Sequence, residues 1–255
     1  MKPNMKIFDS MKMTKLKIMT AAICSVICMA TASAQVAVRA DVGAMYYYGL
    51  SPAESGIGVM PGLGAQLGAD YDLHVKGTFY VTPGLNWSYR FVAASNFADA
   101  TGNEFIHEHF LNVPLYFKWK FNIKPDKFGM QVYFGPVYSF GLASHSRLDM
   151  MASGIHITGT YDYYRKVADI ELDGESSGSL VDAVKEQIED AGLRFKRFDI
   201  RLDFGVGFML KRNNELVLGF DIGTFNRSAN NLDMNTYMNS CNFYLGYRYR
   251  FGKKQ

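Results

Sequence analysis

The sequence predicts an all-β fold, an eight-stranded antiparallel up-and-down transmembrane β-barrel with one long extracellular loop that contains a short helix. Three observations predict it. Large apolar residues alternate strictly with other residues in eight separate segments. The opposite face of these segments consists of Gly, Ser, Asn and isolated charges. The connections between the segments alternate between short and long, as they do in a meander of neighbouring strands.

The stretch Leu111–Phe121, which reads LNVPLYFKWKF, shows the alternation most clearly. All of its odd-numbered residues are large and apolar, whereas Lys118 and Lys120 lie at even positions. A helix returns to the same face every 3.6 residues and a strand every two, so this pattern predicts a strand. Pro114 shares the parity of the lysines, and its missing N–H predicts a bulge or a local widening of the sheet there.

The first four predicted strands follow one another over the amino-terminal half. Residues 36–48 alternate Val, Ala and Tyr with charged residues and Gly, and residues 63–74 alternate Leu, Ala and Tyr with Gly and Asp. A short turn then leads to residues 79–91, where Phe, Val, Trp and Tyr alternate with Thr, Gly, Asn and Ser. The fourth strand is the stretch 111–121, and a longer connection separates it from the third.

The last four predicted strands repeat the pattern. Residues 128–142 follow the short turn NIKPDK, and residues 198–210 set Phe, Ile, Leu and Val against Asp, Arg and Gly. The seventh strand, residues 216–222, follows the turn KRNNE, and residues 241–251 form the eighth. Each apolar face therefore has a sparse polar face opposite it.

The polar face decides between a soluble sheet and a membrane barrel. Its side chains are too small and carry too few charges for a surface exposed to water. They nevertheless carry too many charges for the dry core of a soluble protein. Both features are expected if the barrel is inverted, with the apolar face toward lipid and the polar face toward the lumen. Closure into a ring leaves no unpaired edge in the hydrocarbon. Eight strands enclose a lumen that side chains just fill.

The amino terminus carries the features of an export signal. Lysines precede a mostly apolar run, Ile18–Met29, which ends at Ala32-Ser33-Ala34. This layout predicts a secretory signal peptide over residues 1–34 and a barrel domain over residues 35–255. Removing residues 1–34 changes the formal net charge from +3 to −1. The bulk charge therefore gives no reason to expect nucleic acid as a partner.

Charged residues on the polar face predict a salt-bridge network in the lumen. If the amino terminus of the barrel lies on the periplasmic side, these residues fall in the lower half of the lumen, and both signs of charge are present. The predicted network consists of Arg39, Asp41, Asp70, Asp72, Lys118, Lys120, Arg248 and Arg250.

The longest connection, residues 144–194, is expected to have its own organisation outside the membrane. Its segment SLVDAVKEQIEDAG predicts a short helix, because Ser179 and Asp182 resemble an N-cap signature and Gly192 ends the pattern. We expect this loop to bind a partner, to cover the mouth of the barrel, or to pack as an ordered surface loop. The residues expected to contact a partner are Tyr161, Tyr163, Tyr164, Leu180, Val184 and Ile188.

Metal binding and catalysis have weaker support in the sequence. His107-Glu108-His109 places two histidines on one face of a strand, but no third and fourth ligand can be identified, so no metal is expected. Asp99 and Glu104 lie near these histidines without a spacing that indicates catalysis. We therefore expect no catalytic residue, no cofactor and no enzymatic activity. Cys241 shares the parity of the lipid-facing residues and is expected to be inert.

Several segments resemble the PorT-like outer-membrane β-barrel family of Bacteroidota-type bacteria. LNVPLYFKWKF resembles the fourth strand of that family, FGPVYSFGL its Gly-Pro-aromatic strand, and DIRLDFGVGFML its Asp-to-Gly-x-Gly strand. The terminal LGYRYRF is similar to the closing strand. The resemblance implies an eight-stranded, non-enzymatic barrel, and the member for which the family is named is associated with type IX secretion.

These observations favour a small barrel of the cell outer membrane that acts as a structural or interaction module, accessory to protein secretion or envelope assembly. Its expected partners are outer-membrane lipid and lipopolysaccharide, together with an envelope or secretion protein that contacts the 144–194 loop. One alternative is a narrow passive pore, which the charged lumen disfavours. A second alternative is an outer-membrane enzyme with its site at the barrel rim.

Overall fold

The computed structural model describes residues 35–51, 56–97, 100–124, 127–152, 155–173, 178–191, 194–211, 213–229 and 237–251. The predicted signal peptide, residues 1–34, lies outside these ranges. Among the described residues, no helix combines the length and the apolar character needed to cross a membrane.

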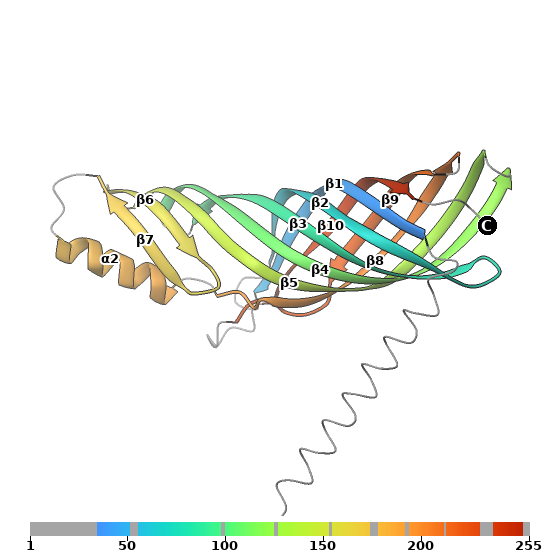
Figure 1. Ribbon diagram of the computed structural model, residues 1–255. Helices are drawn as coiled ribbons and strands as arrows, with labels where there is room; N and C mark the ends of the chain where they lie inside the picture. Colours follow the sequence, from blue (N-terminus) through green and yellow to red (C-terminus); the bar gives the residue numbers. More distant parts are fainter. Residues whose placement is uncertain are drawn as a thin grey trace, which may run out of the picture.

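Eight long strands form a closed antiparallel ring, which confirms the predicted barrel (Figure 1). Each ring strand pairs with the ring strand before it and the ring strand after it, and β1 pairs with β10 to close the ring. The ring strands are β1 (Gln35–Ser51), β2 (Gly56–Lys76), β3 (Phe79–Phe97), β4 (Ala100–Lys124), β5 (Phe128–Ala152), β8 (Phe198–Leu210), β9 (Asn214–Gly223) and β10 (Tyr237–Arg250).

Three further elements project beyond one end of the ring, which we call the outer end (Figure 1). They are β6 (Ile155–Asp162), β7 (Val167–Leu172) and α2 (Gly178–Ala191). The strand β5 pairs with β8 as far as Phe140 and with β6 from His145 onward. The predicted 144–194 loop therefore begins inside β5, and most of it is regular structure. We call β6, β7 and α2 together the platform.

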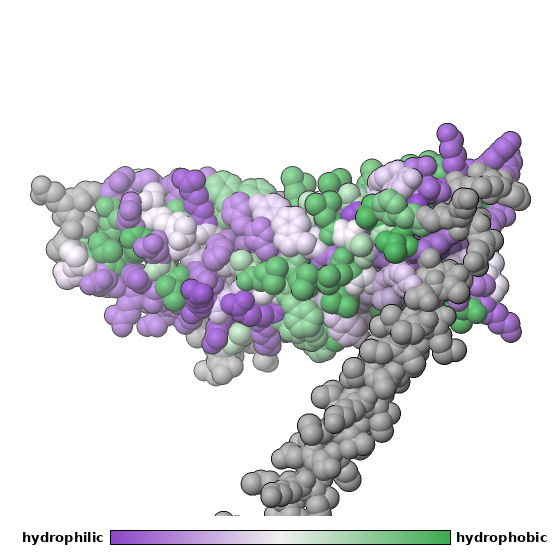
Figure 2. Space-filling model, in the orientation of Figure 1, coloured by the Kyte–Doolittle hydropathy of each residue, from purple (hydrophilic) through white to green (hydrophobic). Residues whose placement is uncertain are grey.

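The two faces of the ring strands have the predicted polarity. On β4, Phe117 and Trp119 face outward, whereas Lys118 and Lys120 are buried. Large apolar side chains such as Leu63, with 64% of its surface exposed, form a lipid-facing belt around the ring. Figure 2 shows hydrophobic residues over the middle of the barrel and hydrophilic residues toward both ends of the visible face.

The polarity of β5 inverts near Leu142. The register with β4 shifts here, because His109 is opposite Ala143 and Phe110 is opposite Gly141, which leaves Leu142 as an extra residue. Before this bulge, outward residues of β5 are apolar; after it, the outward residues include His145, Arg147 and Asp149, whereas Leu148 is buried. The bulge thus marks the point where the outward side chains of β5 change from apolar to mostly polar.

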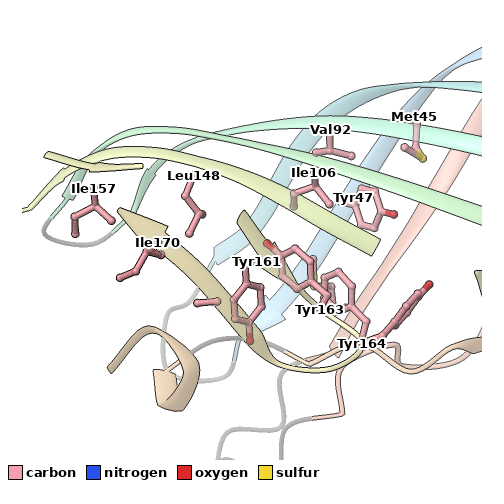
Figure 3. Packing of buried hydrophobic residues seen from close by; sticks show 13 residues of the cluster. Met45, Tyr47, Val92, Ile106, Leu148, Ile157, Tyr161, Tyr163, Tyr164 and Ile170 are labelled. Carbon is pink, nitrogen blue, oxygen red and sulfur yellow. The ribbon is translucent and has the colours of Figure 1, made fainter. Parts of the chain in front are cut away.

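A hydrophobic core fills the outer end, in contrast to the polar lumen below it (Figure 3). Inward-facing residues of the ring strands, among them Met45, Val92 and Ile106, pack here against residues of β6 and β7 such as Ile157 and Ile170. Apolar burial of this kind stabilises a structure in water. The outer end is therefore built like a soluble protein and the remainder like a membrane protein.

Two details differ from the sequence prediction. No bulge forms at Pro114, because the pairs Pro114–Val137 and Phe117–Phe134 keep one register and the shift lies at His109 and Phe110 instead. The pairing of β3 with β4 is interrupted beside Pro114, passing from Pro83–Leu115 to Asn86–Asn112, so a local widening stays a prediction. The predicted long connection between the third and fourth strands is mostly strand, since β3 and β4 pair as far as Phe97 and Ala100. The outer parts of β3 and β4 do not alternate between apolar and polar residues, so the sequence pattern did not identify them as strand.

Candidate functional site

The lower lumen contains a dense network of ion pairs. Asp72 on β2 accepts hydrogen bonds from Lys118 Nζ at 3.1 Å, Lys120 Nζ at 2.6 Å and Thr82 Oγ1 at 2.7 Å. Arg250 Nε lies 3.5 Å from the same carboxylate. These side chains are buried, so the charges are compensated by one another rather than by water.

Glu215 joins this network to the last strand. Arg248 bridges Glu215 and Asp70, with a nitrogen-to-oxygen distance of 2.9 Å to each. Arg250 and Gln131 also donate to Glu215. Glu215 comes just before the predicted seventh strand, which explains why the sequence pattern missed it.

A layer of tyrosines lies above the ion pairs. Arg39 pairs with Asp41 and donates to the Tyr116 hydroxyl at 3.0 Å. The hydroxyl groups of Tyr116 and Tyr244 donate to Asp203 at 2.6 and 2.7 Å. These side chains cross the lumen from different strands, and together they occupy its middle.

A second charged group lies between this layer and the outer end. Arg201 pairs with Asp199 and Asp221, and it donates to Ser240 Oγ at 3.1 Å. Arg227 donates to both carboxylate oxygens of Glu108, at 2.6 and 3.1 Å. The alternation of β8 and β9 places Arg201, Asp199 and Asp221 on the inner face. Arg227 lies in the connection after β9, so no strand pattern identifies it.

The lumen of the described barrel is therefore filled. All eight charged residues of the predicted network are buried in it, and the lysines and the arginines of β10 meet Asp70 and Asp72. Two small cavities of about 20 and 10 Å³, lined by described residues, lie beside Arg90. Spaces of this size hold a water molecule or two.

The platform residues expected to contact a partner have a different role. Tyr161, Tyr163 and Tyr164 are buried in the outer-end core (Figure 3). Val184 and Ile188 pack against this core from α2. Only Leu180 is exposed, with 40% of its surface accessible. From α2, Val181, Val184 and Ile188 face this core, so Leu180 does not belong to the buried side of the helix. The sequence could not show that β6 and β7 lie beneath α2.

Polar contacts fix the platform at its edges. Glu189 of α2 accepts a hydrogen bond from the Ala168 backbone N–H at 2.9 Å, which satisfies an edge group of β7. The two ring nitrogens of His156 each lie 2.8 Å from a carboxylate, Asp173 on one side and Asp149 on the other. These hydrogen bonds raise the pKa of His156, Asp173 giving the larger effect.

His107, Glu108 and His109 do not converge on one point. Glu108 faces inward to Arg227, whereas His107 and His109 face outward, and His107 Nδ1 shares a hydrogen bond of 2.6 Å with the Tyr89 hydroxyl. Within the described part of the chain, no group of three or more His, Cys, Asp or Glu residues is arranged to hold a metal ion.

Comparisons with known proteins agree with this architecture. The chain matches the family described as "Outer membrane protein beta-barrel domain" over residues 19–251. No curated protein matches it.

Similar solved structures include Neisserial surface protein A, with 11% identity over 86% of this chain and 99% of that one and a TM-score of 0.44. The outer membrane enzyme PagL has 10% identity over 82% and 97% and a TM-score of 0.37. Ail, the attachment invasion locus protein of Yersinia pestis, has 9% identity over 84% and 98% and a TM-score of 0.34.

Proposed function

Since the chain belongs to the outer membrane protein β-barrel domain family, we propose that its barrel is a closed, non-enzymatic anchor that holds the platform at the cell surface as an interaction module. Short turns face the periplasm and the longer connections face outward in barrels of this kind. With that orientation, β6, β7 and α2 project from the membrane into water.

The observation that carries this proposal is the inversion of polarity at the bulge in β5. Beyond Leu142 the outward side chains of β5 include His145, Arg147 and Asp149 in place of an unbroken apolar row, and the outer ends of the strands enclose a hydrophobic core that α2 covers. A barrel that served only as a membrane plug would gain nothing from strands as long as β4 and β5, with 25 residues each. The extension positions an ordered surface away from the membrane.

The exposed face of the platform is available for that role. Asp182 and Glu186 lie on the exposed side of α2, and Asp169 and Glu171 are exposed on β7. A partner would meet these polar side chains rather than the buried tyrosines. A finer form of the proposal is a role accessory to protein secretion or envelope assembly, which the PorT-like segments favour, with lipid and lipopolysaccharide as the surrounding partners.

The pore alternative conflicts with the filled lumen. Among the described residues, buried ion pairs and the tyrosine layer cross the channel axis, and the two small cavities beside Arg90 have room only for isolated waters. Single-channel recording in planar bilayers distinguishes the two proposals, because an anchor gives no steady conductance steps. The enzyme alternative is likewise not favoured, since the rim histidines point outward and away from Glu108.

A photo-cross-linking experiment in intact cells tests the proposal. A photoreactive amino acid replaces Asp182 or Glu186 on the platform and, as a control, Leu218 on the lipid-facing side of β9. We expect a discrete protein adduct from the platform positions and none from Leu218. The absence of protein adducts at both platform positions, in correctly folded protein, would contradict an interaction role.

A further inference from the structure

The lipid-facing wall of β1, β2 and β3 contains an apolar groove of about 540 Å³. Ala65 on β2 forms its floor, because it is paired with Val42 on one side and with Tyr89 on the other. Leu63 and Phe91 extend the walls in the outer direction. A small side chain between larger ones leaves a depression along the strand direction.

The groove lies at the outer boundary of the lipid-facing belt. The inward neighbours of its outer residues, Met45 and Val92, belong to the outer-end core rather than to the polar lumen. At the same level the Tyr89 hydroxyl shares a hydrogen bond with His107, and the Tyr89 and His109 rings lie 5.2 Å apart. The groove thus has an apolar body with polar groups beside its outer part.

We propose that this groove binds one acyl chain of an outer-leaflet lipid, whose headgroup lies beside Tyr89 and His107. The groove is continuous with the belt that already faces hydrocarbon, so its occupant comes from the membrane. A stable contact with a second barrel or another protein takes roughly 20–30 residues from each partner, whereas seven residues line this groove. A single chain needs only the apolar depression, and burying it against Ala65 removes no polar group from water.

The test uses purified protein in dimyristoyl phosphatidylcholine vesicles that contain a trace of phosphatidylcholine with a diazirine in its acyl chain. After illumination, labelled peptides are quantified by mass spectrometry. We expect β2 and β3 to be labelled several-fold more than β9, although Leu216 and Leu218 of β9 are also exposed. Equal labelling of all lipid-facing strands would overturn the proposal, because it would show only general contact with lipid.

Two substitutions on one face of β2 make the test specific. Ala65→Phe fills the groove and is expected to reduce the labelling of β2 to the level of β9, whereas Ala69→Phe, on the same face outside the groove, leaves it unchanged. Folding is checked by heat-modifiability on gels, and Ala65→Leu replaces the larger variant if that one does not fold. Unchanged labelling in the filled variant, or protein dimers cross-linked at the groove, would refute an acyl-chain site. Neither result affects the platform proposal.

Discussion

At the scale of single residues, the lumen depends on charges that have no access to water. Among the described residues, eight cations and nine carboxylates are buried, and they are distributed between the lumen and the outer-end core. They are Arg39, Arg90, Lys118, Lys120, Arg201, Arg227, Arg248 and Arg250, and Asp41, Asp70, Asp72, Glu104, Glu108, Asp199, Asp203, Glu215 and Asp221. Removing one member leaves a buried charge without compensation, which costs more than the pair itself contributes.

Lys118→Glu tests whether this network stabilises the barrel. It places a third carboxylate beside Asp70 and Asp72, so we expect the free energy of unfolding to fall by at least about 3 kcal/mol. Urea unfolding in lipid vesicles measures the change. Lys124→Glu, at an exposed position of the same strand, should change stability by less than about 0.5 kcal/mol. Equal effects of the two substitutions would show that the network does not stabilise the barrel.

Glu104 is a buried carboxyl group of a different kind, because it lies at the outer-end core and no cation among the described residues forms an ion pair with it. It accepts a hydrogen bond from the Tyr163 hydroxyl, and burial raises its pKa. An acid whose pKa is higher in the folded state destabilises that state as pH rises above its unfolded pKa, and the loss is complete above the folded pKa.

We therefore expect Glu104→Gln to stabilise the platform at pH 8 and to remove part of its pH dependence. Amide hydrogen exchange of residues 155–172, measured at several pH values and corrected for intrinsic rates, follows the change. Glu186→Gln, at an exposed position of α2, is the matched control and should have no such effect. A platform that is less protected in Glu104→Gln at pH 8 would show that the carboxylate is needed in its charged form.

At the scale of elements, β5 shows how one extra residue joins two environments. The inward residues have odd numbers up to Gly141 and even numbers from Ser144 onward. Because side chains alternate with a period of two, only an unpaired residue can produce this change of parity. The bulge therefore keeps both faces correct on either side of the membrane boundary.

Two deletions distinguish the bulge from the regular strand. Deleting Leu142 removes only the extra residue, so we expect folding yields close to those of the unaltered protein. Deleting Val137 turns Tyr138 and Phe140 toward the lumen until the bulge compensates, and we expect little folded protein. Heat-modifiability after refolding into vesicles measures both yields. Similar yields for the two deletions would contradict this account of the bulge.

The elements also show where sequence patterns are informative. The lipid-facing parts of all eight ring strands follow from alternation, since lipid demands large apolar residues at every second position. The outer parts of β3 and β4 do not, because water outside and a mixed core inside impose no such rule. The apolar residues of α2 show the same limit, because an apolar stripe on a helix indicates that something covers it without showing what does.

At the scale of the whole molecule, the same strands enclose a polar lumen along the barrel and a hydrophobic core at its outer end. Urea weakens apolar burial in water, whereas lipid shields the barrel wall. We expect moderate urea to expose amides of β6 and β7 to hydrogen exchange while β8 stays protected, as measured by mass spectrometry on protein in vesicles. Simultaneous exchange of β6 and β8 would show that the two parts unfold as one.

The arginines of β10 have a consequence for assembly of the barrel. Arg248 meets Asp70 of β2 and Glu215 of β9, and Arg250 meets Asp72 and Glu215, so their partners come from strands on both sides of the closing seam. A last strand that entered one residue out of register would turn both guanidinium groups toward hydrocarbon. Slips of the closing strand by one residue are therefore strongly disfavoured, because they would place two uncompensated charges in the hydrocarbon.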